Sequence, residues 1–253
     1  MSKLLMLLLS ALLSCQVMAQ STDQMLKRAD SYRLQAGAAR VTTVVRLYKK
    51  QVLDKTHLYE VYARPDRQSL VLFQSKTEAG QKLLMLGDNY WLLMPKSRRP
   101  IRITPMQKLL GEASVGDISS LRWQDDYQAS LIGPTTLTLN GQAVKANELA
   151  LTSKTKGASY ARITLWLDQQ NDFPLKADLY LRSGKLAKQA LFSGKGTAAT
   201  GDNPPMMVKT MTLLDKIQPA KKTVIEYQDR TPYQLADKYY NPAYLIRQAQ
   251  VDL

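Results

Sequence analysis

The stretch that decides the fold, residues 83–118, reads LLMLGDNYWLLMPKSRRPIRITPMQKLLGEASVGDI. Between Tyr90 and Pro95, successive side chains alternate between the two faces of an extended segment, and neither face carries a charge. A strand without a polar face is either covered on both sides or borders an apolar cavity. The stretch therefore predicts a buried strand beside an apolar space.

A basic segment follows this strand. It contains Lys96, Arg98, Arg99 and Arg102, and Pro100 disfavours a helical conformation for the residue before it. This pattern indicates a hairpin or an edge of the sheet. Two interpretations of Arg98, Arg99 and Arg102 stay open: they contact a phosphate head group or an anionic membrane at the mouth of the cavity, or they form a solubilising edge that prevents pairing between sheets.

The end of the stretch predicts a helix of at most two turns, capped by Thr104 and ended by Gly111. Met106, Leu109 and Leu110 are spaced at i, i+3 and i+4 and form its single apolar face. A helix this short is not stable alone in water, so it has to dock on other residues. We expect either a lid over an apolar cavity or a connecting helix packed permanently on the core.

A family resemblance rests on residues 91–111, WLLMPKSRRPIRITPMQKLLG, and on the GDI at 116–118. This block resembles the periplasmic outer-membrane lipoprotein-sorting proteins, relatives of the carrier LolA. The resemblance extends from Met25 to the strands around Leu165 and Leu179. LolA itself is shorter and lacks the Arg-Arg-Pro segment, so the resemblance implies a LolA/LolB-like fold more directly than it implies a cargo. It also implies a membrane transporter as the donor of that cargo.

Residues 1–19 are expected to form a secretory signal. The apolar run Leu4–Leu13 is too short to span a bilayer, which needs about twenty residues. Cleavage after Ala19 would leave 20–253 as a single LolA-like domain in the periplasm. The alternative is a lipobox ending at Cys15, which would anchor the protein through a lipid. Because Cys15 is the only cysteine, the mature chain has no intramolecular disulfide in either case.

Most of the remaining chain has the period of two that is typical of strands. We expect Arg40–Leu53 to be one strand, and residues 160–168 and 175–182 each alternate apolar and polar side chains. This alternation is typical of an antiparallel sheet that is solvated on one side. The prediction is a mainly β fold, in which about eleven strands form a curled, unclosed half-barrel. Short helices would fill or cover its concave face, at residues 22–35, 104–111 and 117–123.

The C-terminal residues predict two short, tyrosine-rich helices. Thr231-Pro232 and Asn241-Pro242 each combine a capping residue with a proline at the first helical position. These helices would either pack against the sheet or present a surface to a partner.

Few residues suggest enzyme chemistry. The only histidine, His57, lies in an alternating strand pattern and is interpreted as structural, and no serine stands in a Gly-x-Ser-x-Gly turn. One histidine, with a cysteine in the signal region, does not make a zinc site. Asp125 and Asp126 could form a carboxylate pair for acid–base chemistry, but their place just before a strand is more typical of a turn. We expect no catalytic residue, cofactor or metal.

The charge and the pattern together predict a carrier. The net charge of +14 favours anionic surfaces, and secretion argues against nucleic acid as the partner. We expect a non-enzymatic periplasmic protein that binds the acyl chains of a lipid or lipoprotein in an apolar half-barrel and conveys them between the inner and outer membranes. The predicted lining and lid residues are Trp91, Leu93, Met106, Leu109 and Leu110.

Two other hypotheses stay open. A periplasmic sensor or adaptor would use the same fold to bind and regulate an inner-membrane transporter or signalling protein. A receptor anchored in the outer membrane would require lipidation of the sole cysteine.

Overall fold

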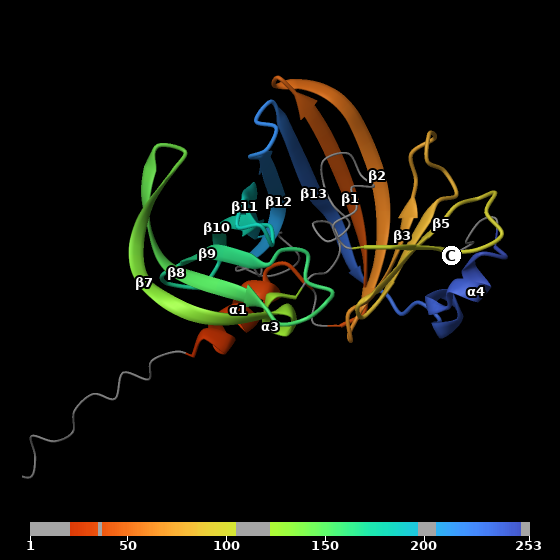
Figure 1. Ribbon diagram of the computed structural model, residues 1–253, viewed down its shortest axis with the longest axis horizontal. Coiled ribbons are helices and arrows are strands. Elements are labelled where there is room, and N and C mark those ends of the chain that lie inside the picture. Colours follow the sequence, from red (N-terminus) through yellow and green to blue (C-terminus); the bar gives the residue numbers. More distant parts are fainter. Residues whose placement is uncertain (1–20, 35–36, 105–121, 197–205, 249–253) are drawn as a thin grey trace, which may run out of the picture.

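The chain folds into one curled antiparallel sheet with short helices (Figure 1). The computed structural model describes residues 21–34, 37–104, 122–196 and 206–248. Within these ranges the sheet has thirteen strands in the order β6-β5-β4-β3-β2-β1-β13-β12-β11-β10-β9-β8-β7. Their bounds are β1 (Ala39–Lys49), β2 (Val52–Arg64), β3 (Gln68–Phe73), β4 (Lys82–Leu86), β5 (Asn89–Leu93), β6 (Ile101–Ile103), β7 (Tyr127–Leu139), β8 (Gln142–Ser153), β9 (Arg162–Asp168), β10 (Pro174–Tyr180), β11 (Leu186–Gly196), β12 (Met206–Asp215) and β13 (Lys221–Pro232).

The predicted mainly β, unclosed sheet is confirmed, with thirteen strands in place of about eleven. The prediction of one strand over Arg40–Leu53 is wrong, because the chain turns at Lys50 and Gln51, whose φ angles are 47° and 66°. Left-handed backbone is uncommon for residues other than glycine, so the alternation gave no sign of this turn. At the hairpin between β7 and β8, by contrast, the pair Asn140-Gly141 is typical of a tight turn, so the sequence indicates where the chain turns.

The strand pleat divides the apolar side chains between the two faces of the sheet. One row runs across β2, β3, β4 and β5 through the register partners Val61, Val71, Leu83 and Leu92, and it belongs to the core on the concave face. The adjacent row belongs to a separate core on the convex face, through Tyr62, Leu70, Leu84 and Trp91. The predicted strand without a polar face is therefore covered on both sides.

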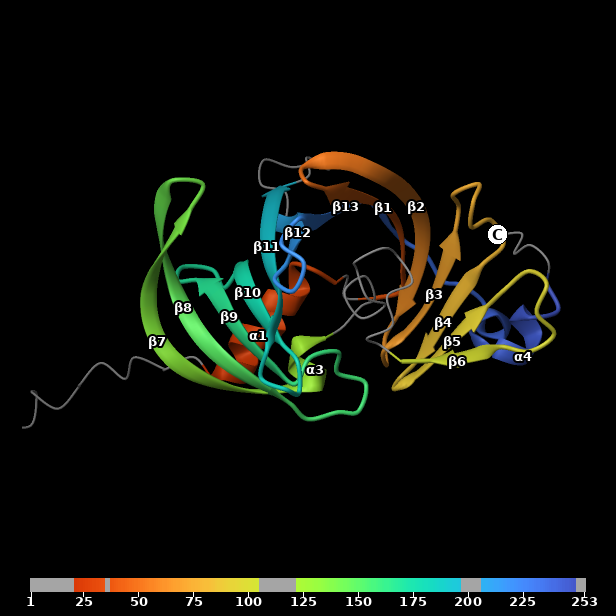
Figure 2. The ribbon, with the colours of Figure 1, turned by 45° about the horizontal axis from the view of Figure 1, so that its top comes forward.

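Two helices lie inside the curl, against the part of the sheet that contains β7–β10 (Figure 2). The first, α1 (Thr22–Ser31), buries Met25, Leu26 and Ala29 in the concave core, which confirms the predicted N-terminal amphipathic helix. The second, α3 (Trp123–Asp126), contributes its tryptophan. It begins where the predicted piece at 117–123 ends, and 117–121 lie outside the described residues.

The C-terminal helices cover the convex face over strands β2–β5. The 3-10 helix η1 (Asp237–Tyr240) and α4 (Pro242–Leu245) bury Tyr240 and Leu245 in the convex core. Asn241 caps α4 as predicted, because its side-chain oxygen accepts the backbone N–H groups of Ala243 and Tyr244. The helix predicted at Thr231-Pro232 is wrong, since both residues end β13, where Thr231 pairs with β1.

The two edges of the sheet differ in length. Strand β6 has three residues, in agreement with the edge that the basic segment predicted. Strand β7 has thirteen, and its register with β8 shifts between Leu131 and Gly133, just before Pro134. The bulge and the proline interrupt the free edge of β7.

An ion pair joins the β2–β5 part of this open sheet to the residue before β7. Arg67, in the turn between β2 and β3, contacts Asp88 Oδ1 at 2.7 Å and Asp126 Oδ1 at 2.8 Å. Asp126 is fully buried at the end of α3, and the Thr155 hydroxyl donates to its carboxylate at 2.6 Å. Burial raises the pKa of Asp126, whereas the Thr155 hydrogen bond and the Arg67 charge oppose that shift. We call Arg67, Asp88, Asp126 and Thr155 the clamp.

The substitution Arg67→Met tests the clamp. It leaves the Asp126 carboxylate buried without its cation, so the free energy of unfolding should fall by about 3–5 kcal/mol in urea denaturation. Lys49→Met is the matched control, because it breaks the exposed Lys49–Asp54 pair and should cost less than about 1 kcal/mol. Adding Asp126→Asn to Arg67→Met should restore part of the loss. Equal costs for Arg67→Met and Lys49→Met would contradict the clamp.

Candidate functional site

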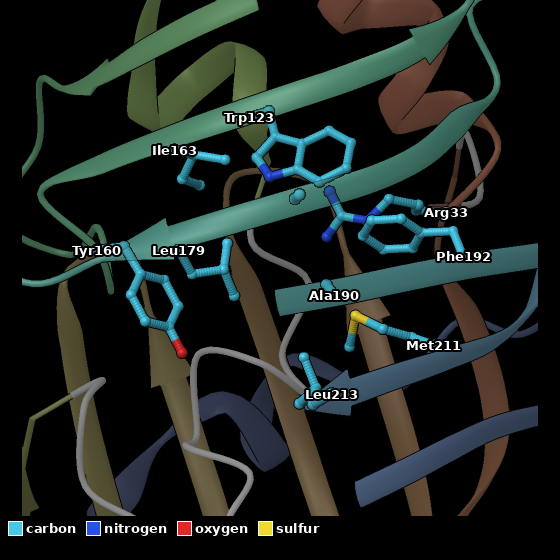
Figure 3. Close-up of a pocket in the computed structure, with 10 residues that line it drawn as sticks. Arg33, Trp123, Tyr160, Ile163, Leu179, Ala190, Phe192, Met211 and Leu213 are labelled. Atoms are coloured by element: carbon cyan, nitrogen blue, oxygen red, sulfur yellow. The ribbon is translucent and has the colours of Figure 1, made fainter. Parts of the chain in front are cut away.

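The concave core contains an apolar cavity of about 30 Å³. It lies between the helices and strands β9–β12, with Trp123 of α3 on one side and Met211 and Leu213 of β12 on the other (Figure 3). Tyr160, just before β9, also lines it. The remaining lining comes from the inward-facing positions of β9, β10 and β11, namely Ile163, Ala177, Leu179, Ala190 and Phe192, together with Arg33.

Arg33 is the one charged side chain among the described lining residues. Its guanidinium carbon lies 3.9 Å from the centroid of the Trp123 ring, and Figure 3 shows the guanidinium between Trp123 and Phe192. Phe192 meets the Trp123 ring edge-on at 5.7 Å. A cation over an aromatic face is attracted by the ring, so Arg33 is held across one side of an otherwise apolar space.

Asp30 places Arg33 and Trp123 relative to each other. One carboxylate oxygen contacts Arg33 Nη1 at 3.1 Å, and the other accepts the backbone N–H of Gln124 at 3.0 Å. This carboxylate therefore connects α1 to α3. Burial raises the pKa of Asp30 to about 6, although Arg33 and the backbone N–H groups favour the ionised form. The site thus contains a carboxyl group whose charge changes near neutral pH.

The prediction that Trp91 and Leu93 line the cavity is wrong. Leu93 is buried in the convex core and Trp91 packs against it, beside residues of the C-terminal helices. Their neighbours Tyr90 and Leu92 belong to the concave core. Because side chains alternate along a strand, the sequence identified two buried faces but not which of them borders the cavity.

The predicted head-group residues lie at the β6 edge of the sheet. Arg102 pairs in register with Trp91, its guanidinium carbon lies 5.0 Å from that ring, and it donates to Asn89. It is therefore on the convex side, away from the cavity. Arg98 and Arg99 are exposed in the turn that precedes β6. The lid residues Met106, Leu109 and Leu110 lie outside the described residues.

Sequence reasoning missed Arg33, Trp123 and Asp30. The inward positions of β9 and β10 were visible as apolar alternation, whereas Arg33 and Trp123 are ninety residues apart and no local pattern connects them. The structural interpretation of His57 is supported, because its Nδ1 lies 2.7 Å from Glu78 Oε2 and the ring stacks near Tyr59.

The open sheet, the helices inside it and the apolar concave cavity define a protein with a LolA-like fold. A LolA superfamily protein from Nitrosomonas europaea is 26% identical, with a TM-score of 0.78, over 89% of this chain and 100% of the other. A domain named for outer membrane lipoprotein sorting, from Vibrio parahaemolyticus, is 22% identical, with a TM-score of 0.71, over 89% and 98%. The fold is also that of a DUF1329 family protein from Desulfovibrio piger, 20% identical, with a TM-score of 0.72, over 88% and 97%.

A family model described as an uncharacterized protein matches residues 65–247, and the chain belongs to this family. The resemblance to LolA-like lipoprotein-sorting proteins is thereby confirmed. No curated protein matches the chain. In the part of the chain that the structure describes, no helix has the length and apolar character needed to cross a membrane.

The raised pKa of Asp30 predicts a pH-dependent stability. The folded protein binds this proton up to about pH 6, and the unfolded chain releases it near pH 3.8. Stability is therefore highest below the lower value and falls as the pH rises to the upper one. Relative to Asp30→Asn, which cannot titrate, the wild type should lose up to about 3 kcal/mol between pH 4 and pH 7 in urea denaturation. A difference that does not change with pH would contradict this.

Proposed function

We propose that this protein is a non-enzymatic periplasmic carrier, which binds the acyl chains of a lipid or lipoprotein on the concave face and transfers them between the inner and outer membranes. The observation that carries the proposal is the apolar cavity of the concave core, where Arg33 is the one charged side chain among the described lining residues. Such a surface favours acyl chains, because each buried methylene contributes about 0.8 kcal/mol without directional contacts.

The cavity has to enlarge to hold a chain. Its volume of about 30 Å³ has room for roughly two water molecules. One of its side chains is suited to rearrangement. Met211 has an unbranched thioether that adapts to differently shaped neighbours.

The family relationship supports the remaining parts of the proposal. The Vibrio parahaemolyticus domain is named for outer membrane lipoprotein sorting. We extend this to export through cleavage of residues 1–19, to an inner-membrane transporter as donor, and to a lid formed by Met106, Leu109 and Leu110. On the β5 strand, Tyr90 and Leu92 replace Trp91 and Leu93 as the proposed concave residues.

Filling the cavity tests the proposal. Ala190→Leu adds three carbon atoms at a fully buried lining position, so less space is left for a chain. Native mass spectrometry with lipid extraction, on protein purified from the periplasm without detergent, should find acyl species on the wild type. We expect several-fold less of them on Ala190→Leu.

Ala143→Leu serves as the control, because it makes the same change at an exposed position of β8. It should keep the wild-type lipid content. A wild-type protein that carries no lipid, and takes none up from added vesicles, would overturn the carrier proposal and favour the sensor or adaptor.

A further inference from the structure

A second cavity, of about 300 Å³, borders the first. Tyr160 lines both of them. On the inner side, Ala158 and Leu181 line the second cavity and also pack against the concave core. The two spaces therefore lie on either side of one residue, and a molecule with an apolar part and a polar part could occupy both.

The second cavity has a more polar lining than the first, and two cations contribute to it. Lys156, in the loop after β8, and Arg182, in the turn after β10, both line it. Neither cation has a carboxylate partner within the described ranges, and the lining residues given by the structure include no aspartate or glutamate. The hydroxyl groups of Ser153 and Thr155 lie in the same wall. An anion is the ligand that this set of groups fits.

A buried hydroxyl group supports the presence of a ligand. Ser159 is 5% exposed, and its Oγ has no hydrogen-bond partner in the part of the chain that the structure describes. Buried polar groups are nearly always hydrogen-bonded, so one without a partner in a cavity wall requires an explanation. The loop that carries it is fixed in place, because Tyr127 Oη donates to Tyr160 O at 3.1 Å and Thr155 belongs to the clamp.

We propose that this cavity binds the phosphate ester of a lipid head group while the acyl chain lies in the concave cavity. Lys156 and Arg182 would pair with the phosphate, and Ser159 Oγ would donate to one of its oxygens. The inference rests on the proposed carrier function, and it gives that function a preference for anionic lipids.

The test compares two probes with the same acyl chain, lysophosphatidylglycerol and the uncharged monoacylglycerol, by native mass spectrometry. The wild type should prefer the lysophosphatidylglycerol about tenfold. Lys156→Gln with Arg182→Gln should abolish this preference and leave monoacylglycerol binding unchanged. The control, Lys27→Gln with Lys76→Gln, removes the same charge from exposed positions elsewhere and should keep the preference.

The outcomes distinguish a failure of the head-group site from a failure of the carrier function. Equal binding of both probes by the wild type would overturn the head-group site and leave the carrier intact, whereas binding of neither probe would overturn the carrier. Glycerol 3-phosphate has the phosphate ester without the chain. If it competes as well as the lysolipid, the site serves a free phosphate ester and the lipid assignment is wrong.

The turn between β1 and β2 lies beside the turn between β12 and β13 at one end of the sheet. The N–H of Lys50, between β1 and β2, donates to the carbonyl of Ala220, between β12 and β13, at 2.7 Å. Three large apolar side chains are exposed there: Val52 at 70%, Leu53 at 50% and Ile217 at 45%. Figure 1 shows both turns together at the top, at the opposite side from α3. We call this region the tip.

The tip is strongly basic. Its two acidic residues are engaged locally, since Asp54 pairs with Lys49 at 3.3 Å and the buried Asp215 accepts the N–H groups of its own turn. Exposed apolar side chains surrounded by lysines are typical of a surface that enters an anionic lipid interface. The lysines of the tip are Lys49, Lys50, Lys55, Lys216, Lys221 and Lys222.

We infer that the tip docks on an anionic lipid bilayer, with its three apolar side chains entering the interface and its lysines contacting the head groups. The argument is independent of any cargo. Co-sedimentation with vesicles of phosphatidylglycerol and phosphatidylcholine should detect binding that weakens as salt is added, because salt screens the lysines.

Val52→Asp with Ile217→Asp should weaken this binding at least tenfold. The matched control is Leu131→Asp with Ile132→Asp, which makes the same change at exposed apolar residues of β7, distant from the tip. Its binding should stay at the wild-type level. Wild-type protein that does not bind anionic vesicles, or a control that loses as much binding as the tip variant, would overturn the inference.

Discussion

The buried contact between Arg67 and Asp126 determines how an open sheet can enclose a core. Among the residues that the structure describes, backbone hydrogen bonds hold thirteen strands side by side, and they do not join β6 to β7. The clamp connects the turn after β2 to the residue before β7 with side chains alone. The contact ties α3 and, through Thr155, the loop after β8 to the turn between β2 and β3, so the concave face is covered without closing a barrel.

Alternation in the sequence predicted much of the fold. The run around Tyr90 and Leu93 has no polar face, and the structure covers both faces, one with the concave core and one with the C-terminal helices. Alternation shows that the two faces of a strand differ, but it does not show which face is concave. That depends on the curl of the whole sheet, and so Trp91 was assigned to the wrong side.

The candidate site was less accessible to prediction. Its apolar wall followed from strands such as 160–168, whereas Arg33, just after α1, and Trp123 of α3 are brought together only by the tertiary fold. Asp30 shows the difficulty. In the sequence it is one more polar residue in an amphipathic helix, and its role comes from the N–H of Gln124, ninety-four positions away. Long-range contacts of this kind leave no local pattern.

The interrupted edge of β7 limits how copies of the protein can associate in a crowded compartment. An open sheet exposes two rows of unpaired backbone groups, and a second copy could extend the sheet by adding its own strand. The β6 edge offers three residues to such a copy, and the bulge at Gly133 with Pro134 breaks the longer edge into short pieces. Polymerisation through the edges is thereby disfavoured, and the open architecture can be abundant without assembling into fibres.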